Sequence, residues 1–426
     1  MSDVTADNPP IDLRNPFVRA MALGRMAGIL GLQIIIVAVG WELYERTGSA
    51  WALGFVGAVE LAPVLLLLVP AGNLADRMAR RNLAIIAQLV LALAATGLLV
   101  GSLLGASETA IYAMIALVGA SRAFSAPSVG TILPQLLKPR QFVHANAWVS
   151  SGSQFAAAAG PAVGGALIAI YGSTTVAYGV AAACQFIFIG FLLTLPRIDP
   201  PPSSGRRSWA EAFAGFTFIR RTPLFLAAIT LDLFAVLLGG AVALLPIFAK
   251  DILEVGPVGL GWLRAAPALG SMTMALVQAR IKPWNRPGAV MLAAVVGFGL
   301  ATIGFGLSEN FALSMACLFL TGLFDSVSVV VRTTLEQILT PDPLRGRVSS
   351  INYVFIGMSN ELGAFESGAT AALFGTVASV VGGGIAVIGV VAAVMLKWPQ
   401  LARIGPLHTL APNAYAMLTY QVRNNT

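Results

Sequence analysis

The chain has 426 residues, of which 57% are hydrophobic and only 11% are charged. Soluble domains usually carry about 25% charged residues, so this composition excludes an ordinary soluble globular fold and indicates a membrane protein. The net charge of +7 does not indicate a nucleic-acid partner, because the bases gather on the two tails and on every second connection between apolar stretches. That asymmetry is the positive-inside pattern, and it predicts an even number of spans with both termini in the cytoplasm.

Apolar stretches long enough to cross a bilayer recur along nearly the whole chain. A helix needs about 20 apolar residues to cross roughly 30 Å of hydrocarbon. No long alternation of polar and apolar residues indicates a membrane β-barrel, so the predicted fold class is an all-α integral membrane protein. We predict about twelve transmembrane helices, over residues 19–44, 51–71, 82–104, 109–134, 145–171, 173–195, 222–249, 257–280, 287–308, 311–336, 347–374 and 377–396.

A proline- and serine-rich polar segment divides these spans into two sets of six. A repeat supports the division, because Gln135-Leu136-Leu137-Lys138-Pro139 is echoed by Gln337-Ile338-Leu339-Thr340-Pro341. The pattern predicts two pseudo-symmetric six-helix halves, which is typical of transporters with internal repeats. The predicted parts are a cytoplasmic N-tail (1–18), an N-terminal half (19–195), a cytoplasmic linker (196–221), a C-terminal half (222–396) and a cytoplasmic C-tail (397–426).

Several ionisable residues lie near the middle of predicted spans. A charged side chain there costs about 2.5–3.5 kcal/mol or more, so it should face protein or water rather than lipid. A buried residue that is paired only for helix packing is the alternative for any single acid, and Arg332 with Glu336, one turn apart, is predicted to form such a structural ion pair. The candidates for substrate contact or proton coupling are Glu60, Arg122, Asp232, Asp325, Glu361 and Glu366.

A short charged segment follows the second predicted span and carries one acid among three bases. It reads Gly72-Asn73-Leu74-Ala75-Asp76-Arg77-Met78-Ala79-Arg80-Arg81. It resembles the loop between the second and third helices of major facilitator superfamily transporters, although Ala79 replaces a glycine of that pattern. The resemblance implies a conformational gate in which the charges bridge to a neighbouring helix, and the alternative is a simple topological charge cluster. The gate residues are Gly72, Asp76, Arg77, Arg80 and Arg81.

The fifth predicted span contains Gly160, Pro161, Gly164 and Gly165. These residues resemble a motif of exporters that exchange substrate for protons. Small residues at every fourth position also let a neighbouring helix approach closely, so tight packing alone is the alternative to a hinge that seals the transport path. Two further stretches, residues 40–49 and 340–348, resemble the branch of the superfamily that includes the enterobactin exporter.

The resemblance implies a secondary active transporter in the bacterial inner membrane, with the lipid bilayer, a small-molecule substrate and protons as its partners. The favoured function is proton-coupled export of a small amphiphilic molecule such as a siderophore or drug, by a monomer. Uptake by symport, facilitated diffusion, and an intramembrane enzyme or scaffold are the alternatives. The phosphate-binding pattern of ATPases is absent from the sequence, which excludes ATP as the energy source, and two isolated histidines offer no catalytic triad or metal site. We therefore predict no enzyme activity, metal or cofactor.

Overall fold

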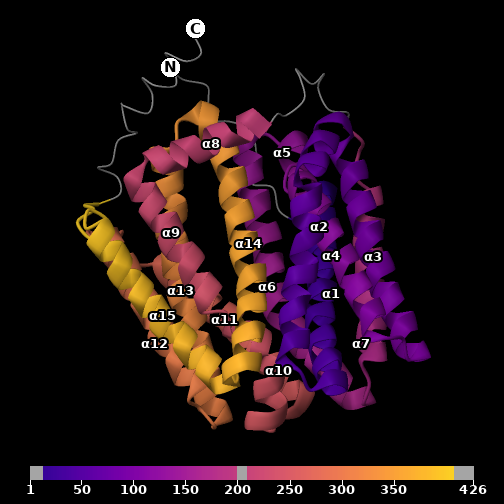
Figure 1. Ribbon diagram of the computed structural model, residues 1–426. Helices are drawn as coiled ribbons and strands as arrows, with labels where there is room; N and C mark the ends of the chain where they lie inside the picture. Colours follow the sequence, from indigo (N-terminus) through magenta and orange to yellow (C-terminus); the bar gives the residue numbers. More distant parts are fainter. Residues whose placement is uncertain (1–12, 199–208, 407–426) are drawn as a thin grey trace. The chain divides into compact units, whose positions relative to one another are not determined.

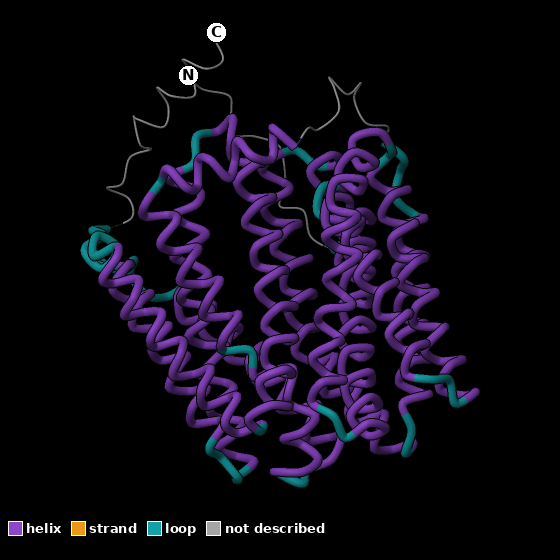
Figure 2. The backbone as a smooth tube through the Cα atoms, viewed as in Figure 1, coloured by secondary structure: helices purple, strands orange, loops and turns teal. Residues whose placement is uncertain are grey.

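The computed structural model describes residues 13–198 and 209–406, apart from a few side chains within these ranges. All regular structure in the described residues is helical (Figures 1 and 2), so the predicted all-α class is confirmed there. In chain order the elements are α1 (Pro16–Thr47), α2 (Ala50–Arg77), α3 (Arg80–Leu104), α4 (Glu108–Val129), α5 (Ile132–Leu136), α6 (Pro139–Tyr171), α7 (Thr174–Leu193), α8 (Trp209–Arg221), α9 (Pro223–Leu238), η1 (Ala241–Leu244), α10 (Leu245–Ile247), η2 (Phe248–Ile252), α11 (Gly256–Gln278), α12 (Pro287–Gly306), α13 (Phe311–Leu339), α14 (Asp342–Phe374) and α15 (Thr376–Lys397).

Ten segments of the described chain are long and apolar enough to cross a membrane. Eight of them are single helices, one combines α4 with α5, and one runs from Pro223 to Ile252 through the elements between α9 and η2. Helices α11 and α14 coincide with the remaining two predicted spans and have 23 and 33 residues. The structure therefore supports a multi-span helical membrane protein, and the count of twelve spans stays a prediction.

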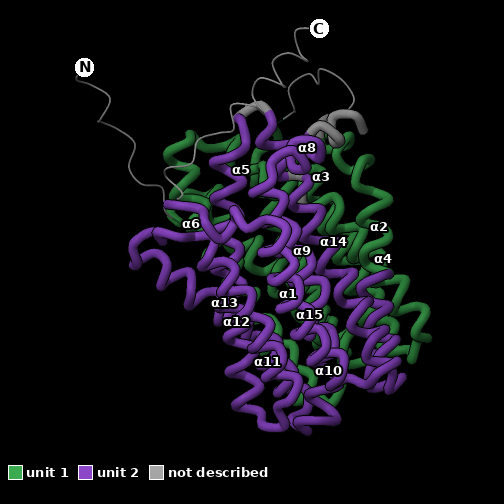
Figure 3. Tube along the Cα trace, turned by 60° about the vertical axis from the view of Figure 1, so that its left-hand side comes forward, with its two compact units in different colours: residues 1–42, 59–206 green, residues 43–58, 207–426 purple. Residues whose placement is uncertain are grey.

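The chain divides into two compact units (Figure 3). The first comprises residues 1–42 and 59–206, and the second comprises residues 43–58 and 207–426. The change of unit near residue 206 falls inside the predicted linker, whose last part forms helix α8. The sequence did not predict that residues 43–58, which form the end of α1 and the start of α2, belong to the second unit.

In the first unit, α3 packs against both α4 and α7, and α6 packs against α7. Buried apolar side chains from six helices form one of its clusters. Since lipid is as apolar as leucine, close packing rather than exclusion of water stabilises such contacts in a membrane. The cluster includes Met21 of α1, Ala84 of α3, Leu133 of α5, Val149 of α6 and Leu192 of α7.

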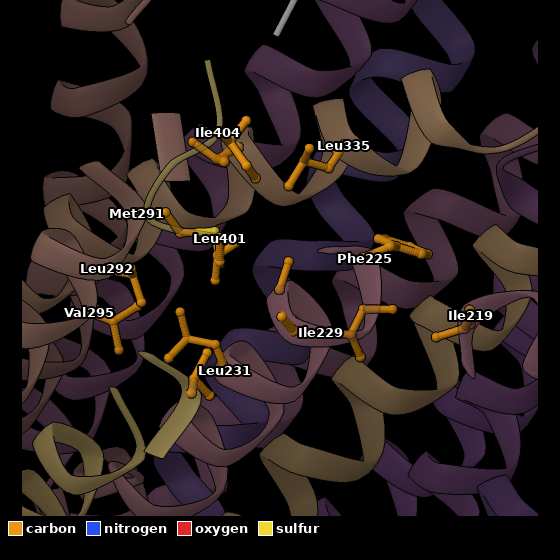
Figure 4. Close-up of a cluster of buried hydrophobic side chains, with 14 of the residues drawn as sticks. Ile219, Phe225, Ile229, Leu231, Met291, Leu292, Val295, Leu335, Leu401 and Ile404 are labelled. Atoms are coloured by element: carbon orange, nitrogen blue, oxygen red, sulfur yellow. The ribbon is translucent and has the colours of Figure 1, made fainter. Parts of the chain in front are cut away.

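The second unit has its own apolar cluster, in which α9, α12 and α13 meet the segment that follows α15 (Figure 4). Helix α13 also packs against α11, and α12 against α15. Helix α9, whose buried face carries Asp232, packs against α13, α14 and α15. The labelled members of the cluster are Ile219, Phe225, Ile229, Leu231, Met291, Leu292, Val295, Leu335, Leu401 and Ile404.

The predicted seventh span is interrupted after Leu238. Gly239 and Gly240 end α9, a 3-10 turn and the short α10 follow, and η2 is a single π-helical turn. Close packing favours a glycine at position 240, because a Cβ there would lie 3.1 Å from Ser367 Oγ and 3.2 Å from the Gly363 carbonyl of α14. The break separates Asp232 on α9 from Lys250 and Asp251 on η2.

Candidate functional site

The first unit contains an ion pair between Glu60 of α2 and Arg122 of α4. An Arg122 guanidinium nitrogen donates a hydrogen bond to Glu60 Oε1, and the Glu60 side chain is only 10% exposed, against 36% for Arg122. Gly119, one turn before Arg122, allows this contact: a Cβ there would lie 2.2 Å from the Glu60 carbonyl oxygen. The close approach of the two helix backbones therefore depends on a residue that has no side chain.

The second unit contains a more deeply buried ion pair, between Asp232 of α9 and Arg332 of α13. The Arg332 guanidinium donates to Asp232 Oδ2, and both side chains are buried. Beside the pair lies a small cavity whose polar lining comes from three residues, Asp232, Asp325 and Ser328, and whose remaining lining is apolar. Within the second unit, the structure thus brings together two of the six residues predicted for substrate contact or proton coupling.

The pairing of Arg332 corrects one prediction. We expected Arg332 to pair with Glu336, one turn later on the same helix, but Arg332 bonds to Asp232 instead. The Glu336 carboxylate accepts hydrogen bonds from the Ser349 hydroxyl and from Asn352 Nδ2, the latter at 2.6 Å, both on α14. Contacts between helices replaced the local pair because a buried carboxylate needs nearly complete hydrogen bonding, and α14 supplies two donors to Glu336.

The other predicted candidates, Glu361 and Glu366, lie on α14 and do not line the cavity. Their helix also packs closely on the segment from the start of α2: a Cβ at Gly57 would lie 2.3 Å from the Glu361 carbonyl, and a Cβ at Gly54 would lie 3.0 Å from the Gly368 Cα atom. The rings of Trp51, Phe55 and Phe365 contact one another beside these glycines, with centroids 5.9–6.2 Å apart.

The predicted gate residues occupy the end of α2 and the start of α3. Gly72, Asp76 and Arg77 belong to α2, and Arg80 and Arg81 open α3; the Asp76 side chain lies outside the described part of the structure. Arg81 donates to the carbonyls of Leu192 and Leu193, each at 3.1 Å, at the carboxyl end of α7. A cation at that end complements the helix dipole and satisfies carbonyls that have no partner in their own helix. Arg81 therefore joins α3 to α7.

The glycines of the exporter-like motif pack against α1. A Cβ at Gly160 would lie 2.6 Å from Gln33 Cβ and 3.2 Å from the Leu30 carbonyl, and one at Gly164 would lie 3.3 Å from Ile34 Cα. Pro161 and Gly165 are also buried in the same helix, α6. The small residues thus permit a close contact between α6 and α1, and the function of this contact as a hinge stays a prediction.

Two polar contacts were not predicted from the sequence. Buried Glu42 of α1 accepts hydrogen bonds from Thr174 Oγ1 at 2.8 Å and from the Tyr178 hydroxyl at 2.7 Å, both on α7. In the second unit, the Tyr44 hydroxyl donates to Asp251 of η2, and the Lys250 ammonium lies 5.8 Å from the centroid of the Tyr44 ring. The usable signals were Glu42 itself, an acid inside a predicted span, and Lys250, a base in one of the connections that the sequence pattern predicts to be poor in bases.

A family model described as transmembrane secretion effector matches residues 9–414 of the chain. Among characterised proteins, the chain is similar to the enterobactin exporter EntS of Shigella dysenteriae serotype 1 and to EntS of Escherichia coli O1:K1. Each is 29% identical over 385 residues, which cover 90% of this chain and 92% of the relative. The likeness therefore extends over both units.

Solved transporter structures share the fold. A bacterial homologue of the human lysosomal transporter Spinster, in an inward-facing and unoccupied conformation, aligns with a TM-score of 0.71 over 93% of this chain and 98% of its own, at 14% identity. A mutant form of the peptide transporter POT aligns with a TM-score of 0.73 over 91% of this chain and 95% of its own, also at 14% identity. At this identity the likeness concerns the fold alone.

Proposed function

This chain belongs to the transmembrane secretion effector family of major facilitator transporters, and from that premise we propose that it exports its substrate in exchange for protons. It is a secondary transporter of the bacterial inner membrane that exports small molecules, and not an enzyme. The proposal adds the driving ion, the substrate class and the residues that couple them.

The observation that carries the proposal is the pair of Asp232 and Arg332, buried beside a cavity that a second carboxylate, Asp325, also lines. An ionised side chain within the membrane costs free energy unless it is paired, so the presence of these carboxylates on membrane helices indicates a function. A carboxylate that is alternately protonated and ionised can link proton movement to a change of conformation. Glu60 with Arg122 forms the corresponding pair of the first unit, and Glu361 and Glu366 are candidates for substrate contact.

The architecture in this proposal has twelve transmembrane helices in two six-helix halves, with the N-tail, linker and C-tail in the cytoplasm. Three features support it: the positions of α11 and α14 match the two remaining predicted spans, the bases follow the positive-inside pattern, and the fold neighbours are transporters. The residues Gly72, Asp76, Arg77, Arg80 and Arg81 form the cytoplasmic gate, and the contact of Gly160 and Gly164 with α1 limits leakage through the transport path. The transporter acts as a monomer and takes no cofactor.

The proposed substrate is a small amphiphilic molecule of the siderophore or drug class. Its support is the 29% identity to enterobactin exporters over 90% of the chain. Enterobactin is therefore the first probe to use. Identity at this level preserves fold and transport mode more readily than the side chains that select a substrate, so a panel of catecholate siderophores and lipophilic cations completes the screen.

The test is reconstitution in vesicles with an imposed pH gradient, following enterobactin and protons together. Export in exchange for protons requires the two to move in opposite directions, with a flux that collapses when the gradient is dissipated by an ionophore. Movement in the same direction would replace the proposal with symport, and a flux indifferent to the gradient would replace it with facilitated diffusion. Glu309→Gln, a neutralised acid in an exposed loop, is the matched control for substitutions of the buried acids.

A further inference from the structure

The charges at the cavity of the second unit do not balance. Asp232 and Asp325 line the cavity, and Arg332, the base that pairs with Asp232, lies on the same face of α13 as Asp325, two turns later. In the first unit the corresponding pair joins one acid, Glu60, to one base, Arg122. With both aspartates ionised, the cluster of the second unit would hold one uncompensated negative charge beside a mostly apolar lining, which is unfavourable.

Two further atoms at the cluster point to a missing ligand. Ser328 Oγ lines the cavity, and the Ser328 residue is only 3% exposed, yet this hydroxyl has no hydrogen-bond partner among the described residues. Arg332 Nε is likewise buried without a partner. Buried polar atoms almost always bond to protein or to ordered water, so a small polar species in the cavity would complete the site.

The two aspartates play different parts. The Asp232 carboxylate accepts the hydrogen bond from Arg332 and is thereby compensated. Asp325 accepts no hydrogen bond from any described residue, and it lies three residues before Ser328 on α13, so that both reach the cavity from one face of that helix. Asp325 is therefore the carboxylate that is available to bind and release a proton.

Among the residues that the structure describes, the surrounding helices supply no other charge to the cavity lining. Helix α12, which contributes Val295 and Phe298 to the lining, has no charged residue. The described charged side chains on the elements that pack against α9 and α13 all lie outside the lining: Arg220 and Arg221 on α8, Arg264 on α11, Glu336 on α13, Arg345, Arg347, Glu361 and Glu366 on α14, and Lys397 on α15.

We propose that Asp325 is the single exchangeable proton site of the transport cycle, that a water molecule in the cavity links it to the Ser328 hydroxyl, and that Asp232 with Arg332 is a fixed pair that positions it. The inference rests on the proposed proton-coupled export and names its ion site. An alkali metal ion fits the cavity poorly, because such an ion needs several oxygen ligands in place of its hydration shell, and five of the eight lining residues are apolar.

In the proposed step, one proton from water on the outer side forms an O–H bond with one carboxylate oxygen of Asp325. The cluster is then neutral overall, since the Asp232 and Arg332 charges cancel, and it can be closed off from water. On the cytoplasmic side the O–H bond breaks, the proton passes to water, and the Asp325 carboxylate is restored. One proton is therefore exchanged at this site in each cycle.

Infrared difference spectroscopy tests the site without any substrate. The full chain in lipid nanodiscs is moved between mildly alkaline and mildly acidic buffer, and the carbonyl band of a buried carboxylic acid is followed. We expect one such band in the wild type, its loss in Asp325→Asn, its retention in Asp325→Glu, and a frequency shift at equal intensity in Ser328→Ala. Glu309→Gln should leave the band unchanged. A band that survives in Asp325→Asn, or that is unaltered in Ser328→Ala, overturns the assignment.

Two further experiments complete the test: one exchanges the cation in the buffer, and the other measures transport in vesicles. Replacing choline with sodium at constant pH should leave the band unchanged; its disappearance would assign the site to an alkali metal ion instead. If wild-type export of enterobactin in vesicles does not depend on an imposed pH gradient, the proposed proton coupling itself is wrong. If export is coupled to protons in the wild type and stays coupled in Asp325→Asn, only the assignment of Asp325 as the proton site is wrong. Loss of coupling in Asp325→Asn, with coupling kept in Asp325→Glu, supports both.

Discussion

Arg332 donates its hydrogen bond to Asp232, which precedes it by one hundred residues, and not to Glu336, one turn away on its own helix. The bond ties α9 to α13 inside the second unit, and both side chains are among the most buried charged groups of the described chain. Glu336 is left to bond across to Ser349 and Asn352 of α14. Three helices of the unit are therefore held by polar contacts that meet on one face of α13.

The buried pair predicts a strong coupling between its two members. Arg332→Met keeps the length of the side chain but leaves the Asp232 charge without compensation, which should lower the free energy of unfolding by about 3–5 kcal/mol. The double variant Asp232→Asn with Arg332→Met removes the charge as well and should regain part of that loss. Thermal unfolding of the purified protein in detergent measures both, with Arg221→Met at the exposed end of α8 as the control. Equal losses in the single and double variants would contradict the coupling.

Arg81→Ala should weaken the contact between α3 and α7. The substitution removes two hydrogen bonds to the carbonyls of Leu192 and Leu193 and the favourable charge at a helix end, together about 1 kcal/mol at this partly exposed position. Arg77→Ala, four residues earlier and exposed, is the matched control and should have little effect on stability. Thermal unfolding in detergent distinguishes the two, and identical midpoints would show that the Arg81 contact contributes nothing.

Asp76→Asn tests the proposed gate through a measurement of transport rather than of stability. Asp76 is the one acid in a segment with three bases, so the substitution should remove the bridge that we propose between this acid and a neighbouring helix, while the apolar spans remain intact. We expect normal membrane insertion and a large loss of substrate export, measured in vesicles at equal protein level. Wild-type flux in this variant would mean that the segment only sets topology.

Gly160→Ala should destabilise the contact between α6 and α1, because the new methyl group would meet Gln33 Cβ at 2.6 Å and the Leu30 carbonyl at 3.2 Å. Overpacking of this kind usually costs about 1–3 kcal/mol. Gly190→Ala is the matched control in α7, where no atom lies within 4 Å of the added Cβ and alanine should stabilise the helix by up to about 1 kcal/mol. Opposite shifts of the thermal midpoint are the expected result. A loss of similar size in both would point to the loss of glycine itself.

Tyr44→Phe removes the hydroxyl that donates to Asp251 and keeps the ring beside Lys250. A hydrogen bond to a charged group contributes about 1.5–3 kcal/mol, so the second unit should lose stability by an amount of that order. Tyr171→Phe, at a position that is 60% exposed, controls for the loss of a tyrosine hydroxyl. Hydrogen exchange of the backbone amides of η2 locates the effect, and unchanged protection there would argue against a role for the bond.

The sequence by itself determined the membrane class, the approximate positions of the helices and the presence of ionisable residues within them. These properties are local, because the free energy of placing a segment in lipid depends on the side chains of that segment. The small residues of α6 likewise predicted a close helix contact, although they did not identify the partner helix. The gate residues were identified by resemblance, since a run of bases has many possible uses.

Only the tertiary structure decided which charges meet. Arg332 has an acid one turn away and another a hundred residues away, and the choice between them depends on which helix lies opposite and on which donors α14 offers to Glu336. The same holds for Arg81, whose partners are backbone carbonyls that carry no signal in the sequence. The excess of acid at Asp325 is a property of the assembled cluster, because a charge balance exists only once the helices that contribute to it are packed together.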